Sequence, residues 1–292
     1  TDIYLTTKNS DGSKNEVKKT VAKGANSIAI GYYSVATANS SIAQGAGTVA
    51  EGGSSIALGS LASTTDTATN SISIGVASSV KKENSIALGT QSSVYGAGSV
   101  ALGAGSRVYN TNSMAMGYGS TVMAANSSAI GVGSKIDFGS GNAQAIGTNA
   151  VINKNSGNSL AFGNRSTIGE NSVNTVAQGF RSTIGTGAHN SMAIGAYASI
   201  GDNAKSSFAM GTTARVAANA ISSMALGEGS SVTKDQSIAL GRNASADFAN
   251  SVALGFQSTT HYYGNPNSRE ASLSTTESAT NVHGLNVGAY LP

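Results

Sequence analysis

The chain has 292 residues, with 37 glycines, no cysteine, no tryptophan and only 11% charged residues. Its 39% of hydrophobic residues is too high for a disordered chain, and the lack of cysteine excludes disulfides, thiolate metal ligands and cysteine nucleophiles. A formal charge of +3, from 17 basic and 14 acidic side chains, is too balanced to indicate nucleic-acid binding. No apolar run approaches the ~20 residues of a membrane span, so we expect no membrane contact by this segment.

Residues 1–25 precede a repeated pattern and differ from it in composition. The alternation from Asp2 to Thr6 predicts a short strand, and the stretch from Asn9 to Gly12 is typical of a turn. The first coil of a stacked repeat exposes a sheet edge and its core unless another segment covers them. We therefore interpret residues 1–25 as an N-terminal cap.

From residue 26 to residue 260, one six-residue phrase recurs sixteen times, as in Asn84 to Gly89 (Asn-Ser-Ile-Ala-Leu-Gly). The glycines that close the phrase are always 14 or 16 residues apart, with eight intervals of 14 and seven of 16. A fixed short period over most of a chain is typical of a stacked repeat architecture. The sequence therefore predicts an all-β domain over residues 26–260, a solenoid of parallel strands.

The three residues before each glycine predict the first strand of a coil. Apolar residues occupy the first and the third of these positions in fourteen of sixteen copies, and Ala occupies the middle position in fifteen. This period of two places the large side chains on one face and Ala on the other. We assign the large side chains to the interior, where four polar exceptions would need buried hydrogen-bond partners or a water. These exceptions are Gln44, Ser128, Gln144 and Gln178.

A second strand is predicted after the glycine, where a small residue and then Val or Ile recur two positions apart, as in Ser106 and Val108. That spacing directs both side chains inward. Glycine between the two strands suits a tight turn with positive φ, which glycine adopts at no steric cost. The extra residues of the longer coils fall in the loop before the next phrase, so we expect them at one edge. Turn glycines assigned a structural role include Gly89, Gly103, Gly117, Gly163, Gly195 and Gly227.

The row of Ala residues, outward by this assignment, is the candidate contact surface with another chain. A solvent-facing strand position would vary among polar residues, whereas this one stays small and apolar. The alternative is that Ala merely tolerates exposure. The predicted interface residues are Ala87, Ala101, Ala115, Ala161, Ala193 and Ala225.

Basic residues suggest a ligand-binding surface. Arg107, Lys135 and Arg215 occupy the outward position of the second strand, and Arg165 and Arg181 lie near the glycine turn. We consider Arg107, Lys135 and Arg215 candidates for contact with anionic polymers. The alternative is that they are solvated charges that keep a β-surface soluble and discourage edge pairing.

Aromatic residues suggest a second surface feature. Tyr95, Tyr109 and Met123 begin three successive loops, so we expect their side chains to stack as a ladder. We interpret this ladder as a contact between protomers, with a ligand site as the alternative.

The sequence carries no pattern of catalytic residues. His189, His261 and His283 are scattered, and no pair of carboxylates recurs at the spacing of a glycosidase. We expect no enzymatic activity, no cofactor and no metal. Two alternatives remain, an ice-binding solenoid, which would need a regular Thr ladder, and a carbohydrate-active β-solenoid, which would need an acidic cluster.

Residues 261–292 leave the repeat. A turn-rich break from His261 to Pro266 is followed by sequence rich in Ser and Thr. We interpret residues 261–292 as a C-terminal cap or a connector.

The phrases from Asn84 to Gly89, Asn158 to Gly163 and Asn250 to Gly255 resemble the Asn-Ser-Val-Ala-Ile-Gly repeats of YadA-like heads in bacterial trimeric autotransporter adhesins. The resemblance implies a left-handed parallel β-roll that assembles as a homotrimer, and it implies that residues 261–292 connect toward a neck and stalk. It also implies a role in virulence and exposure from the outer membrane of a Gram-negative bacterium, with the anchor outside this chain. The implied partners are host extracellular matrix proteins such as collagen or fibronectin, host cells or abiotic surfaces, together with self-aggregation.

Overall fold

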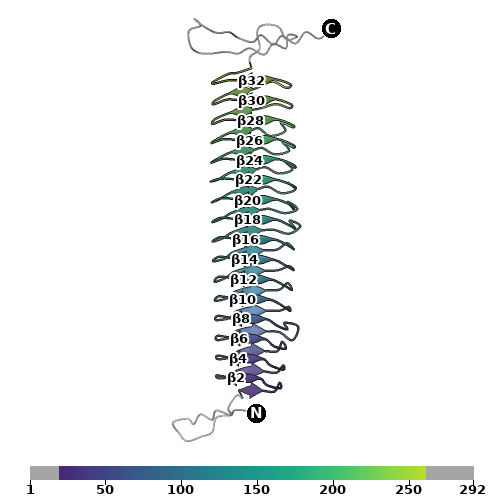
Figure 1. Ribbon diagram of the computed structural model, residues 1–292, viewed down its shortest axis with the longest axis vertical. Coiled ribbons are helices and arrows are strands. Elements are labelled where there is room, and N and C mark those ends of the chain that lie inside the picture. Colours follow the sequence, from purple (N-terminus) through teal and green to yellow (C-terminus); the bar gives the residue numbers. More distant parts are fainter. Residues whose placement is uncertain (1–19, 261–292) are drawn as a thin grey trace. The chain divides into compact units, whose positions relative to one another are not determined.

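The computed structural model describes residues 20–260, which belong to two compact units, one ending at Asp137 and the other beginning at Phe138. In each unit the chain winds through stacked coils that contain two short strands each (Figure 1). Residues 20–260 contain no helix, and therefore none long and apolar enough to cross a membrane. The predicted all-β parallel solenoid with two strands per coil is confirmed. The segments 1–19 and 261–292, with most of the expected cap and the whole expected connector, lie outside the described residues.

The even-numbered strands have three residues each and hold the Ala position at their centre. In the first unit they are β2 (Ile28–Ile30), β4 (Ile42–Gln44), β6 (Ile56–Leu58), β8 (Ile72–Ile74), β10 (Ile86–Leu88), β12 (Val100–Leu102), β14 (Met114–Met116) and β16 (Ser128–Ile130). In the second unit they are β18 (Gln144–Ile146), β20 (Leu160–Phe162), β22 (Val176–Gln178), β24 (Met192–Ile194), β26 (Phe208–Met210), β28 (Met224–Leu226), β30 (Ile238–Leu240) and β32 (Val252–Leu254).

The odd-numbered strands follow the glycine turn and have two residues each. In the first unit they are β1 (Val21–Ala22), β3 (Val35–Ala36), β5 (Val49–Ala50), β7 (Ser63–Thr64), β9 (Ser79–Val80), β11 (Ser93–Val94), β13 (Arg107–Val108), β15 (Thr121–Val122) and β17 (Lys135–Ile136). In the second unit they are β19 (Val151–Ile152), β21 (Thr167–Ile168), β23 (Thr183–Ile184), β25 (Ser199–Ile200), β27 (Arg215–Val216), β29 (Ser231–Val232) and β31 (Ser245–Ala246).

Within each unit the even-numbered strands pair in parallel in one sheet and the odd-numbered strands in another. Equivalent residues of successive coils are register partners, so Ala87 of β10 lies beside Ala101 of β12, and Val94 of β11 lies beside Val108 of β13. The first strand, β1, already pairs with β3. The roll therefore begins before residue 26, inside the segment that the sequence assigns to the cap.

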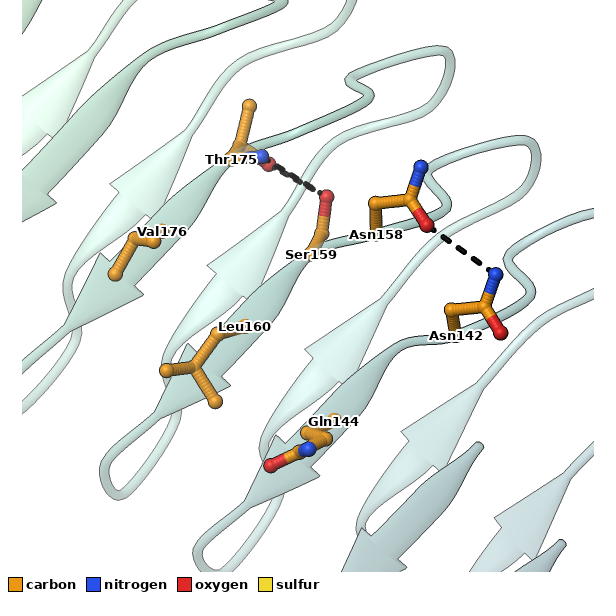
Figure 2. A pocket seen from close by; sticks show the side chains of 7 residues that line it. All are labelled: Asn142, Gln144, Asn158, Ser159, Leu160, Thr175 and Val176. Carbon is orange, nitrogen blue, oxygen red and sulfur yellow. Dashed lines mark hydrogen bonds between the residues drawn. The ribbon is translucent and has the colours of Figure 1, made fainter. Parts of the chain in front are cut away.

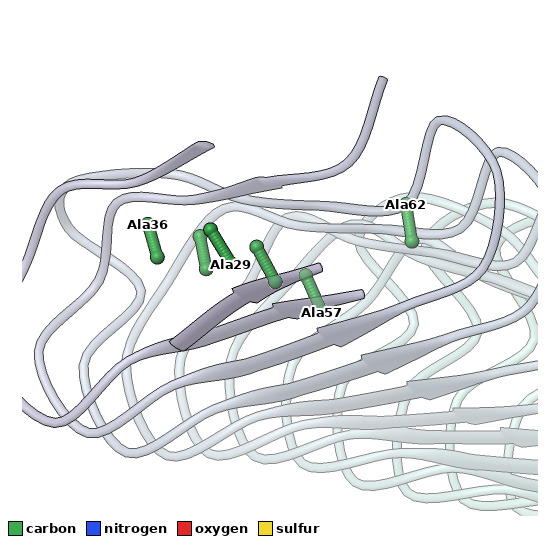
Figure 3. Close-up of a cluster of buried hydrophobic side chains, with 6 residues drawn as sticks. Ala29, Ala36, Ala57 and Ala62 are labelled. Carbon is green, nitrogen blue, oxygen red and sulfur yellow. The ribbon is translucent and has the colours of Figure 1, made fainter. Parts of the chain in front are cut away.

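The Ala row fills the interior of the coil, so its predicted outward orientation is wrong. In β10, Ala87 is 0% exposed, whereas Ile86 is 38% and Leu88 is 39% exposed. Figure 3 shows Ala side chains from both sheets converging inside the first coils, among them Ala29 and Ala36. The interior is too narrow for two rows of large side chains, because Val or Ile from most odd-numbered strands already occupies it. The six Ala residues assigned to an interface are therefore core residues: Ala87, Ala101, Ala115, Ala161, Ala193 and Ala225.

The second strand lies as predicted, with its Val or Ile buried and the preceding residue outward. Val94, Val108 and Val122 are 0% exposed. The interior also holds two rows of small residues, mostly Ser, whose hydroxyl groups bond to backbone. Ser85 donates from Oγ to the carbonyl of Gly96 (3.1 Å), while its amide donates to Oγ of Ser71 in the preceding coil (3.1 Å). These bonds satisfy polar groups inside the coil.

The glycine that closes each phrase turns the chain from the first strand to the second. Gly103 has φ +126°, and its amide donates to the carbonyl of Leu88 in the preceding coil (2.8 Å). A Cβ at Gly103 would lie 2.7 Å from the carbonyl oxygen of Gly117 in the next coil. Positive φ is therefore one of two reasons for glycine here, and close stacking of successive turns is the other. The predicted turn role is confirmed, with positive φ at all six named glycines: Gly89, Gly103, Gly117, Gly163, Gly195 and Gly227.

The longer coils add residues at one edge, as expected, and they also change the interior. In the second unit the added turn contains a residue with positive φ that is always Asn or Gly, such as Asn155 (φ 55°). A fully buried small residue, such as Ser156, follows it. Five of these coils carry Ile where the shorter coils carry Val or Ala: Ile136, Ile152, Ile168, Ile184 and Ile200. The added residues thus widen the core rather than only lengthening a loop.

Candidate functional site

The even-numbered strands expose a face of large apolar side chains, which we call the apolar face. It consists of the residues one and three positions before each turn glycine. Many of these side chains are more than a third exposed, although Ala beneath them is buried. The most exposed are Ile28, Ile30, Ile86, Leu88, Phe162, Met210, Leu240, Val252 and Leu254. Contiguous exposed apolar surface of this kind marks an interaction site in a soluble protein.

Polar residues interrupt the apolar face at the four positions predicted to be inward, so that prediction is wrong. Gln44, Gln144 and Gln178 are exposed and Ser128 is half-buried, all on the outer side of their strands. Their place follows from the inward position of Ala, because neighbours in a strand point to opposite sides. No buried Gln needs a partner in this part of the chain.

Gln144 lies at the rim of a shallow hollow on the apolar face of the second unit. Figure 2 shows Gln144 of β18, Leu160 of β20 and Val176 of β22 in one row. Beside this row, just before β18 and β20, the Asn142 side-chain amide donates to Oδ1 of Asn158 (3.3 Å). The hollow therefore combines apolar strand residues with carboxamides.

The odd-numbered strands carry the predicted basic residues on their outer face. Arg107 in β13 and Arg215 in β27 are exposed. Lys135 in β17 donates from Nζ to Oδ2 of Asp137 at 3.1 Å, so this cation is partly neutralised. Arg107 and Lys135 are two coils apart, with Thr121 between them, and Arg215 belongs to the other unit. The three residues share a type of position, but they do not converge on one point.

The two tyrosines of the expected ladder stack on each other in the first unit, whereas the place of Met123 in the ladder stays a prediction. Tyr95 and Tyr109 stack with ring centroids 5.1 Å apart and planes 2° apart. Nζ of Lys81, one coil before Tyr95, lies 4.7 Å from the Tyr95 ring centroid in a cation–π contact. The Tyr95 ring is therefore covered on both faces, and it offers mainly its edge and hydroxyl to a partner.

A second aromatic cluster, which was not predicted from the sequence, lies at the glycine turns of the second unit. Phe180 and Tyr197 meet edge to face with centroids 5.3 Å apart, and Arg181 lies over both rings. Arg181 and Tyr197 both have positive φ. The sequence signal for this cluster was that all three residues lie one or two positions after a turn glycine. Residues at such positions in successive coils lie beside one another.

Titratable side chains are not gathered into a site that could perform acid–base or metal chemistry. No group of three or more His, Asp or Glu able to hold a metal exists among residues 20–260. His189 accepts a hydrogen bond at Nδ1 from the Val173 amide (3.2 Å), which gives this loop residue a structural role. His261 and His283 lie outside the described residues.

Comparison with known proteins identifies the repeat. A family model described as YadA head domain repeat (2 copies) matches slightly more than half of the chain, at residues 22–48, 36–62, 67–92, 81–106, 109–134, 218–244 and 233–258. The unmatched stretch from 135 to 217 coincides with a run of 16-residue coils. No curated protein matches. Among solved structures, the crystal structure of the collagen-binding domain of Yersinia adhesin YadA is 26% identical, covering 65% of this chain and 81% of that one with a TM-score of 0.27. From the repeat matches, the chain belongs to the YadA head domain repeat family.

Proposed function

We propose that this chain is the head of a bacterial surface adhesin that works as a homotrimer and binds its targets through many weak contacts. The observation that carries the proposal is the apolar face, which a single chain leaves open to water. Membership of the family supports an adhesin function, because the family consists of adhesin heads and not of enzymes. Each coil repeats the same outer positions, so binding sites would be multiplied along a chain and again across three chains.

Assembly would cover the apolar face. Full burial of one Leu or Ile side chain contributes about 1.5–3 kcal/mol, so partial burial of two rows of such side chains stabilises a complex strongly. Copies of the same chain are suited to cover this face, because every coil of one copy finds an equivalent apolar row on the next. In this proposal the interface consists of the large side chains that flank the Ala residues.

Ligand binding would use the surfaces that assembly leaves free, namely the outer face of the odd-numbered strands and the loop edges. Host matrix proteins such as collagen or fibronectin, or abiotic surfaces, are the proposed ligands, with contact between heads as the source of self-aggregation. Collagen binding is a property of the similar YadA structure, which is described as a collagen-binding domain. Arg107 and Arg215, both exposed, are the proposed electrostatic contacts, with Lys135 as a weaker third. Display outside the bacterial outer membrane belongs to the same proposal.

The assembly test uses two aspartate variants in neighbouring positions. Leu88→Asp places a charge on the apolar face, whereas Thr90→Asp adds the same charge at the exposed glycine turn. Sedimentation should give a trimer for the wild type and for Thr90→Asp, and a smaller mass for Leu88→Asp. A wild-type monomer, or an unchanged Leu88→Asp trimer, would contradict the proposed interface.

The binding test measures adhesion of the purified trimer to immobilised collagen, fibronectin and polystyrene across a salt series. Replacing Arg107, Lys135 and Arg215 with Ser should lower adhesion at low salt, where exposed charges are least screened. The control replaces Lys82, Lys154 and Lys205 with Ser, which removes the same charge from the loop edge. Equal adhesion of the wild type and both variants at every salt concentration would exclude a role for Arg107, Lys135 and Arg215.

A further inference from the structure

Copies of a repeat chain could associate in several registers, because successive coils present nearly the same surface. In the even-numbered strands each apolar side chain lies beside an equivalent one, as Ile86 does beside Val100. Moving one copy by a single coil would lose the contacts of the end coils only. The apolar rows alone therefore distinguish poorly between the aligned and the shifted assembly.

The glutamines on the apolar face distinguish the aligned assembly from the shifted ones. Gln44 lies between Ile30 and Leu58 in its row, and Gln178 lies between Phe162 and Ile194. Each interrupts an otherwise apolar ladder at a single coil. Gln144, in the other row, lies beside Leu160 (Figure 2).

These carboxamides are free to bond to a partner chain. The side chains of Gln44, Gln144 and Gln178 make no hydrogen bond to any residue of the described chain, and all three are exposed. A carboxamide carries two donors and an acceptor, so it can donate to an identical group and accept from another. Three symmetry-related glutamines can therefore form a closed ring of hydrogen bonds.

We infer that Gln44, Gln144 and Gln178 form polar layers between copies of this chain, and that these layers fix the register of the assembly. The inference rests on the proposed homotrimer. In the aligned assembly each Gln meets its own copies and its carboxamide is satisfied. After a shift of one coil, Gln44 meets Ile or Leu instead, and a polar group is buried without a partner. A single buried Asn specifies register in coiled coils by the same physics, at a cost in stability.

The first test compares the wild type with the triple variant Gln44→Leu, Gln144→Leu, Gln178→Leu by sedimentation velocity. The wild type should give one species. The variant should still assemble and melt no lower, but staggered copies leave apolar coils uncovered that recruit further chains, so larger and mixed masses should appear. The control, Gln91→Leu with Gln236→Leu, makes the same chemical change at exposed turn positions outside the apolar face and should behave as the wild type.

The second test measures partner choice in cells that produce differently tagged wild-type and triple-variant chains together. Random association at equal expression would give about three quarters of mixed trimers. An unsatisfied buried amide should deplete the mixed trimers about 5- to 150-fold, whereas the control variant should mix randomly with wild type. Random mixing of the triple variant together with a single sedimenting species would overturn the register inference while leaving the homotrimer intact. A wild-type chain that sediments as a monomer would instead overturn the proposed assembly, and the inference with it.

Discussion

Replacing Gly117 with Ala should destabilise the roll far more than the same replacement at Gly119, two residues away. Gly117 has φ +130°, and a Cβ there would lie 2.5 Å from the carbonyl oxygen of Gly131 in the next coil. Gly119 has φ +65°, and a Cβ at this residue would meet nothing within 4 Å. Both variants therefore carry backbone strain, but only Gly117→Ala also forces two stacked turns apart.

The two effects can be separated by magnitude. Left-handed backbone costs an alanine about 1–2 kcal/mol, and the loss of glycine's freedom in the unfolded chain returns about 0.4–1 kcal/mol. Gly119→Ala should therefore cost about 1 kcal/mol. Gly117→Ala carries about 1–3 kcal/mol of strain and a further ~1–3 kcal/mol of overpacking against backbone that cannot rotate away.

Amide hydrogen exchange provides the measurement, because stability in a repeat protein is local and need not follow a two-state transition. Protection should fall strongly in the coils around Gly117 and Gly131 for Gly117→Ala, and only slightly for Gly119→Ala. Equal loss of protection in the two variants would refute the claim that close stacking of turns selects glycine.

Three further changes test the interior and the turns. Val122→Asp buries an unpaired carboxylate in the narrow core and should unfold the surrounding coils, whereas Thr121→Asp, outward in the same strand, should be nearly neutral in urea denaturation. Ala101→Leu should cost at least ~1–3 kcal/mol by overpacking the coil interior, and a stable Ala101→Leu variant would contradict the inward Ala row. Thr213→Gly should stabilise the roll by about 0.5–1 kcal/mol, because Thr213 has φ 57° at the position where the next coil has Gly229 (φ 67°). A lower melting temperature of this variant would argue against backbone strain at Thr213.

The sequence predicted the coil well, because its period and its glycines report backbone geometry directly. The strand after the turn was predicted with the correct face, since Val108 alternates with exposed Arg107 and gives an unambiguous direction. Turn glycines such as Gly103 were predicted from positive φ alone. The contact with the next coil's carbonyl, which requires knowledge of the stacking, could not be read from spacing.

The buried face of the first strand could not be predicted from its pattern. The usual rule that the larger apolar side chains point inward gave the wrong face. In Ile86–Leu88 both faces are apolar, so a period of two shows which residues share a face but not which face is inside. The larger side chains were assigned inward on size. That choice neglected the opposite strand, because Val94 and its equivalents already fill most of a 14-residue coil. Only Ala fits against them. Gln44 and Gln178 were wrongly predicted to point inward for the same reason.

The narrow interior also links folding of the coil to assembly of the chains. Because the core takes Ala, Ser and, in most coils, one Val or Ile, Ile86 and Leu88 remain outside, where a single chain cannot bury them. Every added coil extends this apolar face by the same amount, so the strength of association should grow with the number of coils. The free-energy cost of shifting one copy by one coil does not grow with the number of coils, because a shift changes only the contacts of the end coils and of the few polar residues on the apolar face. A long head therefore gains affinity from its regular coils, but it can gain register only from its irregular ones, such as those that carry Gln44 and Gln178.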